Sequence, residues 1–231
     1  MEPNIAFIAA LIGDTARSRI LVALLGGQAL TATELAVEAD ITAQTASSHL
    51  SKLVEGELLR VRKQGRHKYF QLQSPQVAEL LESLLNISAG SLNPKSVHGP
   101  ADPGLRRARV CYDHLAGELG VALYDALGAQ NLLTREQDET RLTPDGRAFF
   151  AALGLDIEEL KGRQGKRRRP LCKSCLDWSE RRSHLAGVLG NWILEDILAK
   201  GWAERALDSR AMLFTASGLQ AFSKSYGLAK G

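Results

Sequence analysis

The chain has few cysteines and no long apolar run. Its 231 residues include 3 cysteines, an odd number and too few for a disulfide framework, which favours a reducing compartment. No apolar stretch approaches the roughly 20 residues that cross a membrane as a helix. The N-terminus lacks the pattern of a signal peptide. These absences predict a cytoplasmic protein with no membrane partner.

Sequence motifs of catalysis are also missing. The chain contains no Gly-rich phosphate loop, no nucleophile elbow of the hydrolase type and no paired-carboxylate motif. We therefore expect no enzymatic activity. The alternative of an enzyme that uses Cys and His as nucleophile and base is the least favoured.

Size and charge distribution indicate more than one domain and a polyanionic partner. With 231 residues, 45% of them hydrophobic, the chain can form two domains with cores of their own. The formal net charge is only +3. The basic residues are clustered, however, and a cluster of cations is what a polyanion recognises.

Residues 42–55 are predicted to form an amphipathic helix with a small, polar outer face. At about 100° per residue, one stripe carries Ala46, Leu50, Leu53 and Val54. The opposite face carries Gln44, Thr45, Ser48 and Lys52. Thr42 is placed to cap the helix N-terminus. A slim polar helix of this kind can enter the major groove of DNA.

A basic hairpin is predicted directly after this helix, over residues 58–72. Six Lys or Arg residues lie between Lys52 and Lys68, and Gln64-Gly65 is a turn signal between two strand-forming runs. Such a hairpin can bind the phosphates that flank the groove. The residues predicted to contact DNA, on helix and hairpin together, are Thr42, Gln44, Thr45, Ser47, Ser48, His49, Lys52, Arg62, Lys63, Arg66, His67 and Lys68.

The segment upstream completes a winged helix-turn-helix. Residues 14–25 read as a helix that Asp14 caps and Gly26-Gly27 closes, and residues 33–39 read as a short helix followed by the turn Asp40-Ile41. Residues 8–85 resemble the ArsR/SmtB group of bacterial transcriptional regulators. The matching pieces are Asp14-x-x-Arg17-x-x-Ile20-Leu21-x-x-Leu24, Glu34-Leu35-Ala36, Ser47-Ser48-His49-Leu50-x-x-Leu53 and Gly65-Arg66-x-x-x-Phe70-x-Leu72.

The resemblance implies a homodimer that binds a palindromic operator in double-stranded DNA as a repressor, until an effector releases it. It also implies that residues 5–12 and the helix expected at 75–86 form the dimer interface. The family's usual metal sites are missing: the helix before the turn has no Cys or His, and the helix after the wing has Glu79 and Glu82 but no His. We therefore expect control to act through the second half of the chain.

A Pro- and Gly-rich segment and an internal repeat organise that second half. We expect a DNA-binding and dimerisation domain at 1–88, a linker at 89–104 and a sensing domain at 105–231. His114-Leu115-Ala116-Gly117 recurs as His184-Leu185-Ala186-Gly187, and Cys111-x-Asp113 recurs as Cys175-x-Asp177. Two winged-helix-like halves, about 105–160 and 170–231, are expected. The predicted fold class is therefore mainly α with small β wings.

Three readings of the cysteines and histidines of this domain stay open. Zinc takes four ligands of this type, and the predicted set is Cys111, His114, Cys172, Cys175 and His184, with Cys172-x-x-Cys175 supplying two from one turn. The Cys172/Cys175 pair could instead sense oxidants, because the basic run beside it favours thiolate. The third reading is purely structural, with the histidines at helix starts.

A small-molecule effector is the other prediction for this domain. All three Trp residues lie in it, and Trp178 stands among charged residues, a composition that suits a small organic anion or an aromatic compound. The predicted effector-binding residues are Tyr112, His114, Trp178, Arg181, Arg182, His184 and Trp192. The basic run 161–170 is expected to be a loop that adds phosphate contacts or holds an anion.

Overall fold

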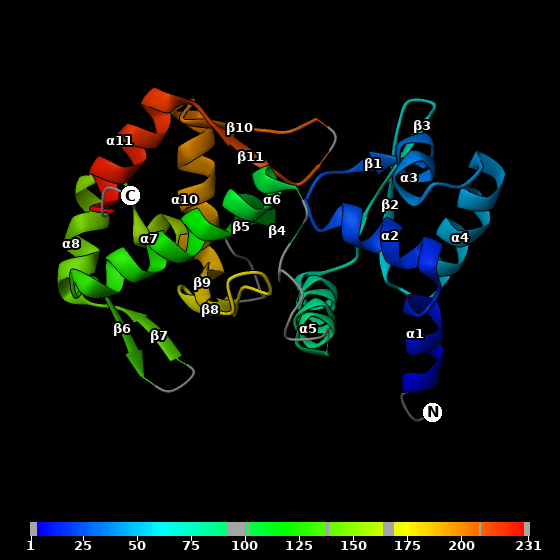
Figure 1. The fold of residues 1–231 in the computed structure, drawn as a ribbon, viewed down its shortest axis with the longest axis horizontal. Coiled ribbons are helices and arrows are strands. Elements are labelled where there is room, and N and C mark those ends of the chain that lie inside the picture. Colours follow the sequence, from blue (N-terminus) through cyan, green and yellow to red (C-terminus); the bar gives the residue numbers. More distant parts are fainter. Residues whose placement is uncertain are drawn as a thin grey trace. The chain divides into compact units, whose positions relative to one another are not determined.

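A computed structural model describes residues 4–91, 100, 102–136, 139–163, 169–207 and 209–228. The chain divides into two compact units, Met1–Ser88 and Ala89–Gly231. Figure 1 shows the helices and the short hairpins of each unit. Among the described helices, none has both the length and the apolar character that crossing a membrane requires.

The N-terminal unit is a winged helix-turn-helix. Its three-stranded sheet has the order β1-β3-β2, with both neighbouring pairs antiparallel. Helices α2, α3 and α4 pack together and bury Ile20, Leu24, Leu35, Leu50 and Leu53. Its elements are α1 (Ile5–Ile12), α2 (Thr15–Leu24), β1 (Leu30–Thr31), α3 (Ala32–Ala39), α4 (Ala43–Glu55), β2 (Leu59–Gln64), β3 (His67–Leu72) and α5 (Pro75–Ser91).

Local hydrogen bonds explain where these helices begin. The side chain of Asp14 accepts from the Arg17 N–H and starts α2, and Thr42 accepts from the Thr45 N–H and starts α4. Thr31 and Glu34 form a reciprocal capping box on α3. Asp40 takes a left-handed conformation with φ 56° and ends α3, which opens the turn into α4. The caps predicted for Asp14 and Thr42 are confirmed.

The second unit repeats one order of elements: hairpin, helix, hairpin, helix. The first half contains β4 (Arg109–Cys111), β5 (His114–Ala116), α7 (Glu118–Ala129), β6 (Leu133–Glu136), β7 (Glu139–Leu142) and α8 (Pro144–Ala152). The second half contains β8 (Lys173–Leu176), β9 (Ser183–Ala186), α10 (Gly187–Ala199), β10 (Ala203–Arg205), β11 (Met212–Phe214) and α11 (Ala216–Tyr226). That the two halves arose by duplication stays a prediction.

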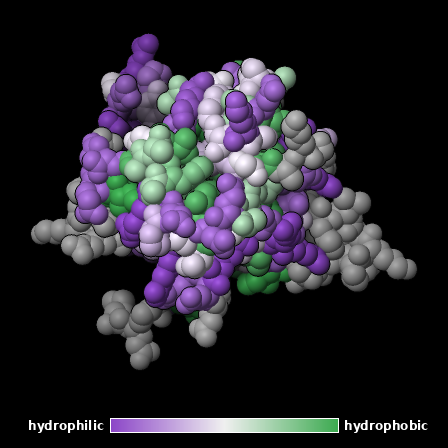
Figure 2. All heavy atoms as spheres, turned by 90° about the vertical axis from the view of Figure 1, so that its left-hand side faces the viewer, coloured by the Kyte–Doolittle hydropathy of each residue, from purple (hydrophilic) through white to green (hydrophobic). Residues whose placement is uncertain are grey.

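The two halves have matching helix caps and pack against each other. Within each half a threonine caps the last helix: Thr143 caps α8 and Thr215 caps α11, each by accepting from the N–H of the glycine three residues on. Helix α7 packs against β9, and α10 packs against β5, so each long helix contacts a hairpin of the other half. One shared core includes Leu123, Phe150, Leu189 and Phe222. In Figure 2, hydrophilic and apolar residues alternate on the face over α8 and α11.

Two helices extend into the expected linker at 89–104. Helix α5 continues to Ser91 instead of ending at Asn86, because the apolar spacing of its first turns runs on through Ile87 and Ala89. A short helix, α6 (Pro103–Arg107), begins within the expected linker, with the Asp102 side chain as its cap. A further helix, α9 (Ile157–Arg163), takes the start of the predicted basic loop. Residues 164–168 lie outside the described residues.

Gly120 and Gly190 let the two halves approach closely. A Cβ at Gly120 would lie 2.6 Å from the Leu115 carbonyl oxygen and 3.6 Å from the Cβ of His184. A Cβ at Gly190 would lie 2.4 Å from the Leu185 carbonyl oxygen and 3.2 Å from the Cβ of His114. The missing side chain at each glycine therefore leaves room for the strand before its helix and for the histidine of the other half.

We expect Gly120→Ala to destabilise the second unit by about 1–3 kcal/mol, because the new methyl group meets backbone that cannot move aside. Urea unfolding followed by tryptophan fluorescence measures this, since all three Trp residues lie in that unit. The control is Gly128→Ala in the same helix, where the nearest atoms are the guanidinium of Arg135. That side chain can shift, and alanine favours a helix by up to about 1 kcal/mol. Equal loss in both variants would contradict the close-approach explanation.

Candidate DNA-reading surface and metal centre

Helix α4 separates an apolar face from an exposed polar face. Ala46, Leu50 and Leu53 are buried. The exposed side chains on the opposite face are Gln44, Thr45, Ser47, Ser48 and Lys52, preceded by the exposed Thr42. Most of these side chains are short, so the helix backbone can approach base edges closely.

The hairpin β2–β3 forms the wing. Its strands pair from Leu59 with Leu72 to Gln64 with His67, and Gly65 takes φ 58° in the turn between them, as the turn signal predicted. The inner end is anchored by the buried side chains of Leu59, Phe70 and Leu72. The cationic outer part is exposed, and it carries Arg62, Lys63, Arg66, His67 and Lys68.

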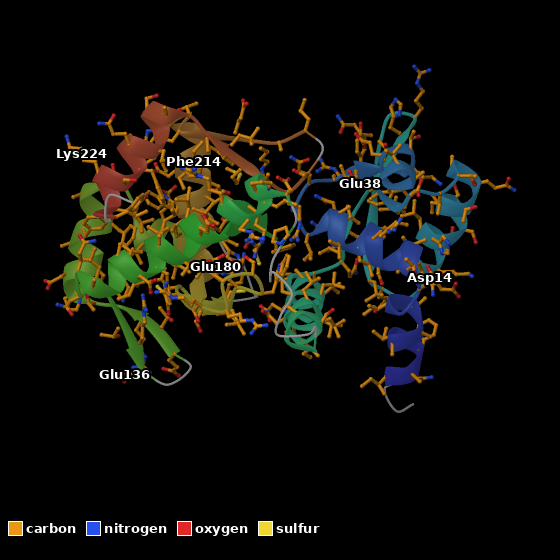
Figure 3. All side chains as sticks on the ribbon, in the orientation of Figure 1. Asp14, Glu38, Glu136, Glu180, Phe214 and Lys224 are labelled. Atoms are coloured by element: carbon orange, nitrogen blue, oxygen red, sulfur yellow. The ribbon has the colours of Figure 1, made fainter. Side chains whose placement is uncertain are left out.

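His49 differs from the other residues predicted to contact DNA. Its side chain is 16% exposed, and its Nδ1 lies 3.9 Å from Asp14 and 3.4 Å from Arg17. Asp14 is labelled in Figure 3, at the start of α2. Position 49 neighbours the buried stripe of α4, so its ring turns back onto α2. Its contact with DNA stays a prediction, with less exposed surface behind it than the other residues of the set have.

Four of the five predicted metal ligands converge in the second unit. The group is Cys111, His114, Cys175 and His184, and its four ligand atoms lie within 4.8 Å of one another. Cys111, His114 and His184 are buried, and Cys175 is partly buried. The two Sγ atoms are 4.0 Å apart, and the two Nε2 atoms are 3.1 Å apart. All three cysteines lie in described segments, and none forms a disulfide.

Cys172 is not a member of this group, which corrects its place among the predicted metal ligands. It lies in the apolar core, and burial, opposed by Arg147, raises the pKa of its thiol to about 12. Its thiolate is therefore disfavoured rather than promoted. The sulfur that contacts Cys175 is that of Cys111, 4.0 Å away. The redox pair Cys172/Cys175 stays a prediction. The histidines lie on strands β5 and β9, not at helix starts.

Two aspartates that sequence reasoning did not assign to the site support the histidines. The Nδ1 of His114 lies 3.2 Å from Asp113, and the Nδ1 of His184 lies 3.4 Å from Asp177. Each aspartate in turn pairs with an arginine. Asp113 pairs with Arg169, and Asp177 lies 2.6 Å from the guanidinium of Arg109. The Cys-x-Asp spacing common to both halves was the signal that could have found them.

Asp177 is the most constrained charged group of the unit. Its side chain is fully buried, and it accepts hydrogen bonds from Arg109, the Gly117 N–H and the Ser179 N–H and hydroxyl. Burial opposes ionisation, but Arg109 and His184 together with these donors hold the pKa of Asp177 well below its usual range. The neighbouring Glu180, in the loop between β8 and β9, is labelled in Figure 3.

The environment of the four-residue group favours a positive charge at its centre. Burial opposes protonation of His114, but the Asp113 hydrogen bond and Cys175 raise the pKa of His114 to about 9. A hydrogen bond from the Cys111 thiol lowers the pKa of Cys175; burial opposes this, and both histidines add to it. Thiolate and carboxylates therefore surround the two imidazoles.

The predicted effector residues lie in several settings, and three of them, Trp178, His184 and His114, are connected through Arg109 and Asp177. Trp192 packs in the core, edge-on to Phe150, with ring centroids 6.1 Å apart. The Arg109 guanidinium lies over the Trp178 ring, 4.9 Å from the centroid of that ring. Arg182 forms an ion pair with Asp125. Tyr112 and Arg181 sit in turns, with φ 60° and 55°. His114 and His184 belong to the four-residue group.

The comparisons with known proteins decide the family. A family model described as a helix-turn-helix domain matches residues 12–62. The HTH-type transcriptional regulator YdfF of Bacillus subtilis (strain 168), named as uncharacterized, is 41% identical over 224 residues, 97% of each chain. The chain belongs to this family of HTH-type transcriptional regulators. The fold expected from the resemblance, a winged helix-turn-helix in the N-terminal part, is confirmed.

Two solved structures are similar to less than half of this regulator. HlyU of Vibrio cholerae N16961 is 27% identical, with 38% of this chain and 97% of HlyU covered at a TM-score of 0.34. The cadmium sensor CMTR of Mycobacterium tuberculosis is 26% identical, with 43% and 99% covered at a TM-score of 0.33. Likeness at these TM-scores carries no argument about function.

Loss of the Asp177 carboxylate should destabilise the second unit strongly. Asp177→Ala leaves the Arg109 guanidinium buried without its partner, a change that typically costs about 3–5 kcal/mol. Equilibrium unfolding in urea measures the difference. Asp125→Ala is the control, because Asp125 also pairs with arginine, with Arg135 and Arg182, but its side chain is 34% exposed. Such pairs contribute about 0–1 kcal/mol. A similar small loss in both variants would refute the importance of burial.

Proposed function

We propose that this regulator is a homodimeric repressor that reads a palindromic operator in double-stranded DNA. Helix α4 enters the major groove, and the β2–β3 wing contacts the flanking phosphates. The observation that carries the proposal is the exposed face of α4, where small polar side chains stand opposite a fully buried apolar stripe. The proposed contacts are Thr42, Gln44, Thr45, Ser47, Ser48, Lys52, Arg62, Lys63, Arg66, His67 and Lys68.

Exposed apolar side chains on α1 and α5 support the dimer. The large apolar side chains that the structure leaves exposed on these two helices are Ile5, Phe7, Leu80, Leu84 and Ile87, with Ile5 84% and Ile87 65% exposed. A single copy of the unit leaves this apolar surface in contact with water. A second copy that covers it also places two α4 helices for two half-sites.

The second unit is proposed to sense the effector that releases DNA. Its Cys/His group is the specific observation that favours a metal-responsive regulator as a second candidate. Because the predicted aromatic and arginine residues are spread over core, turns and surface, a shared pocket for a small organic effector has less support. We propose no enzymatic role, and a cytoplasmic location stays a prediction.

Two variants of α4 test base reading. Ser48→Ala combined with Lys52→Ala should abolish preference for the operator while leaving the fold intact, because both side chains point away from the buried stripe. The measurement is fluorescence anisotropy with operator DNA and a scrambled duplex, with circular dichroism as the fold check. His49→Ala is the comparison, since that ring faces α2. Unchanged discrimination in the double variant would contradict groove entry by this face.

Wing variants should act on every DNA sequence alike. Arg66→Ala or Lys68→Ala removes a phosphate contact, so the slope of log affinity against log salt should fall by about 1. A salt titration with operator and scrambled DNA measures both slopes. Lys200→Ala removes the same charge from the second unit and should leave the slope unchanged. A slope that stays constant in the wing variants would refute phosphate contact by the hairpin.

A further inference from the structure

The strand register of two hairpins places the four side chains of the Cys/His group. Cys111 of β4 pairs with His114 of β5, and Cys175 of β8 pairs with His184 of β9. Opposite residues of an antiparallel pair lie on the same face of the hairpin, with Cβ atoms about 4.5–5.5 Å apart. Strands β5 and β9 contact each other. Each hairpin therefore offers one sulfur and one nitrogen to a common centre.

The aspartates leave both histidines with ligand lone pairs at that centre. Asp113 forms a hydrogen bond with the Nδ1 of His114, and the Asp177 carboxylate lies 3.4 Å from the Nδ1 of His184. A carboxylate beside Nδ1 favours the tautomer that keeps the ring hydrogen on Nδ1. Both Nε2 atoms then present lone pairs to each other at 3.1 Å. Two bare lone pairs at this distance repel, so a positive charge must lie between them, either a shared proton or a metal ion. The two sulfurs beside the imidazoles complete a ligand set for the metal ion.

Distances and donor types fit a tetrahedral metal. With bonds of about 2.3 Å to sulfur and about 2.0–2.1 Å to nitrogen, a tetrahedral ion sets its sulfurs about 3.8 Å apart and its nitrogens about 3.4 Å apart. The corresponding distances here are 4.0 Å and 3.1 Å. Two cysteines and two histidines are a ligand set that tetrahedral Zn²⁺ prefers.

The charges of the site also balance around a divalent cation. Two thiolates neutralise its two positive charges. Arg169 neutralises Asp113, and Arg109 neutralises Asp177. A buried site with no net charge avoids the cost of an isolated ion in a medium of low polarity.

We infer that Cys111, His114, Cys175 and His184 bind one Zn²⁺ ion in a closed, buried tetrahedral site that ties the two halves of the second unit together. Four protein ligands leave no open position, which is the arrangement of a structural rather than a catalytic zinc. The family's usual metal sites, which this chain lacks, are not involved. The inference deepens the second candidate function, a metal-responsive regulator. Only the claim that the zinc controls DNA binding rests on that function, because metal binding itself is measured without DNA.

The test begins with metal content and Co²⁺ substitution of the full chain, produced without a histidine tag. Mass spectrometry of the purified protein should find one zinc per chain. Titration of metal-free protein with Co²⁺ should give the visible absorption of tetrahedral cobalt and a thiolate charge-transfer band, which reports the sulfur ligands directly. Zn²⁺ should abolish both signals and raise the thermal unfolding temperature.

Matched cysteine variants locate the site. Cys111→Ser should remove the zinc or shift the charge-transfer band, whereas Cys172→Ala should keep one zinc and the wild-type cobalt spectrum. Asp113→Asn should weaken zinc affinity about 10–100-fold in competition with a chelator, as loss of a partner to a ligand histidine does. If Cys111→Ser fails to fold, the cobalt titration of the wild-type chain still decides.

Three results would overturn the inference. They are a folded, reduced protein that takes up neither Zn²⁺ nor Co²⁺, a Cys111–Cys175 disulfide in protein purified anaerobically, or loss of the cobalt spectrum in Cys172→Ala alone. Metal binding that leaves operator affinity unchanged supports the site and removes only its regulatory meaning. A protein that holds one zinc but does not bind DNA would contradict the proposed function and leave the zinc site supported.

Discussion

The buried carboxylate of Asp177 is the constraint on which the second unit depends. It holds the guanidinium of Arg109 from the first half, accepts from the backbone of Gly117 at the start of α7 and faces the ring of His184. Three segments from two halves therefore meet at one charge. An unpaired charge at such a place is costly, so the halves adopt the one arrangement that satisfies it. That arrangement also brings the two hairpins together at the Cys/His group.

The N-terminal unit keeps its polar side chains at the surface instead. Its core holds the apolar stripes of α2, α3 and α4 and the inner end of the wing, and the hydroxyl and amide groups of α4 stay in water. A surface of this kind binds by displacing water and counterions from DNA. The two units thus place their polar groups differently: the first exposes those of α4, and the second buries Asp177, His114 and His184.

Much of the N-terminal unit could be predicted because its signals are local. The Thr42 cap, the stripe through Leu50 and the turn at Gly65 depend on neighbours within a few residues. The Cys/His group depends on pairing between strands that are distant in the sequence. The Cys172-x-x-Cys175 spacing suggested two ligands on one turn, but Cys172 lies just before β8 and packs in the core, whereas Cys175 lies on β8 opposite His184. The contacts of Asp113 and Asp177 with the histidines, and of Arg109 with Asp177, could not be predicted without the register of the two hairpins.

The most direct test is an anomalous difference map at the zinc edge from crystals of the full chain. The account predicts one strong peak, about 2.3 Å from the sulfurs of Cys111 and Cys175 and about 2.0–2.1 Å from Nε2 of His114 and His184. Crystals grown from reduced protein with zinc present, but without a peak there and with the two imidazoles joined by a direct hydrogen bond, would contradict it.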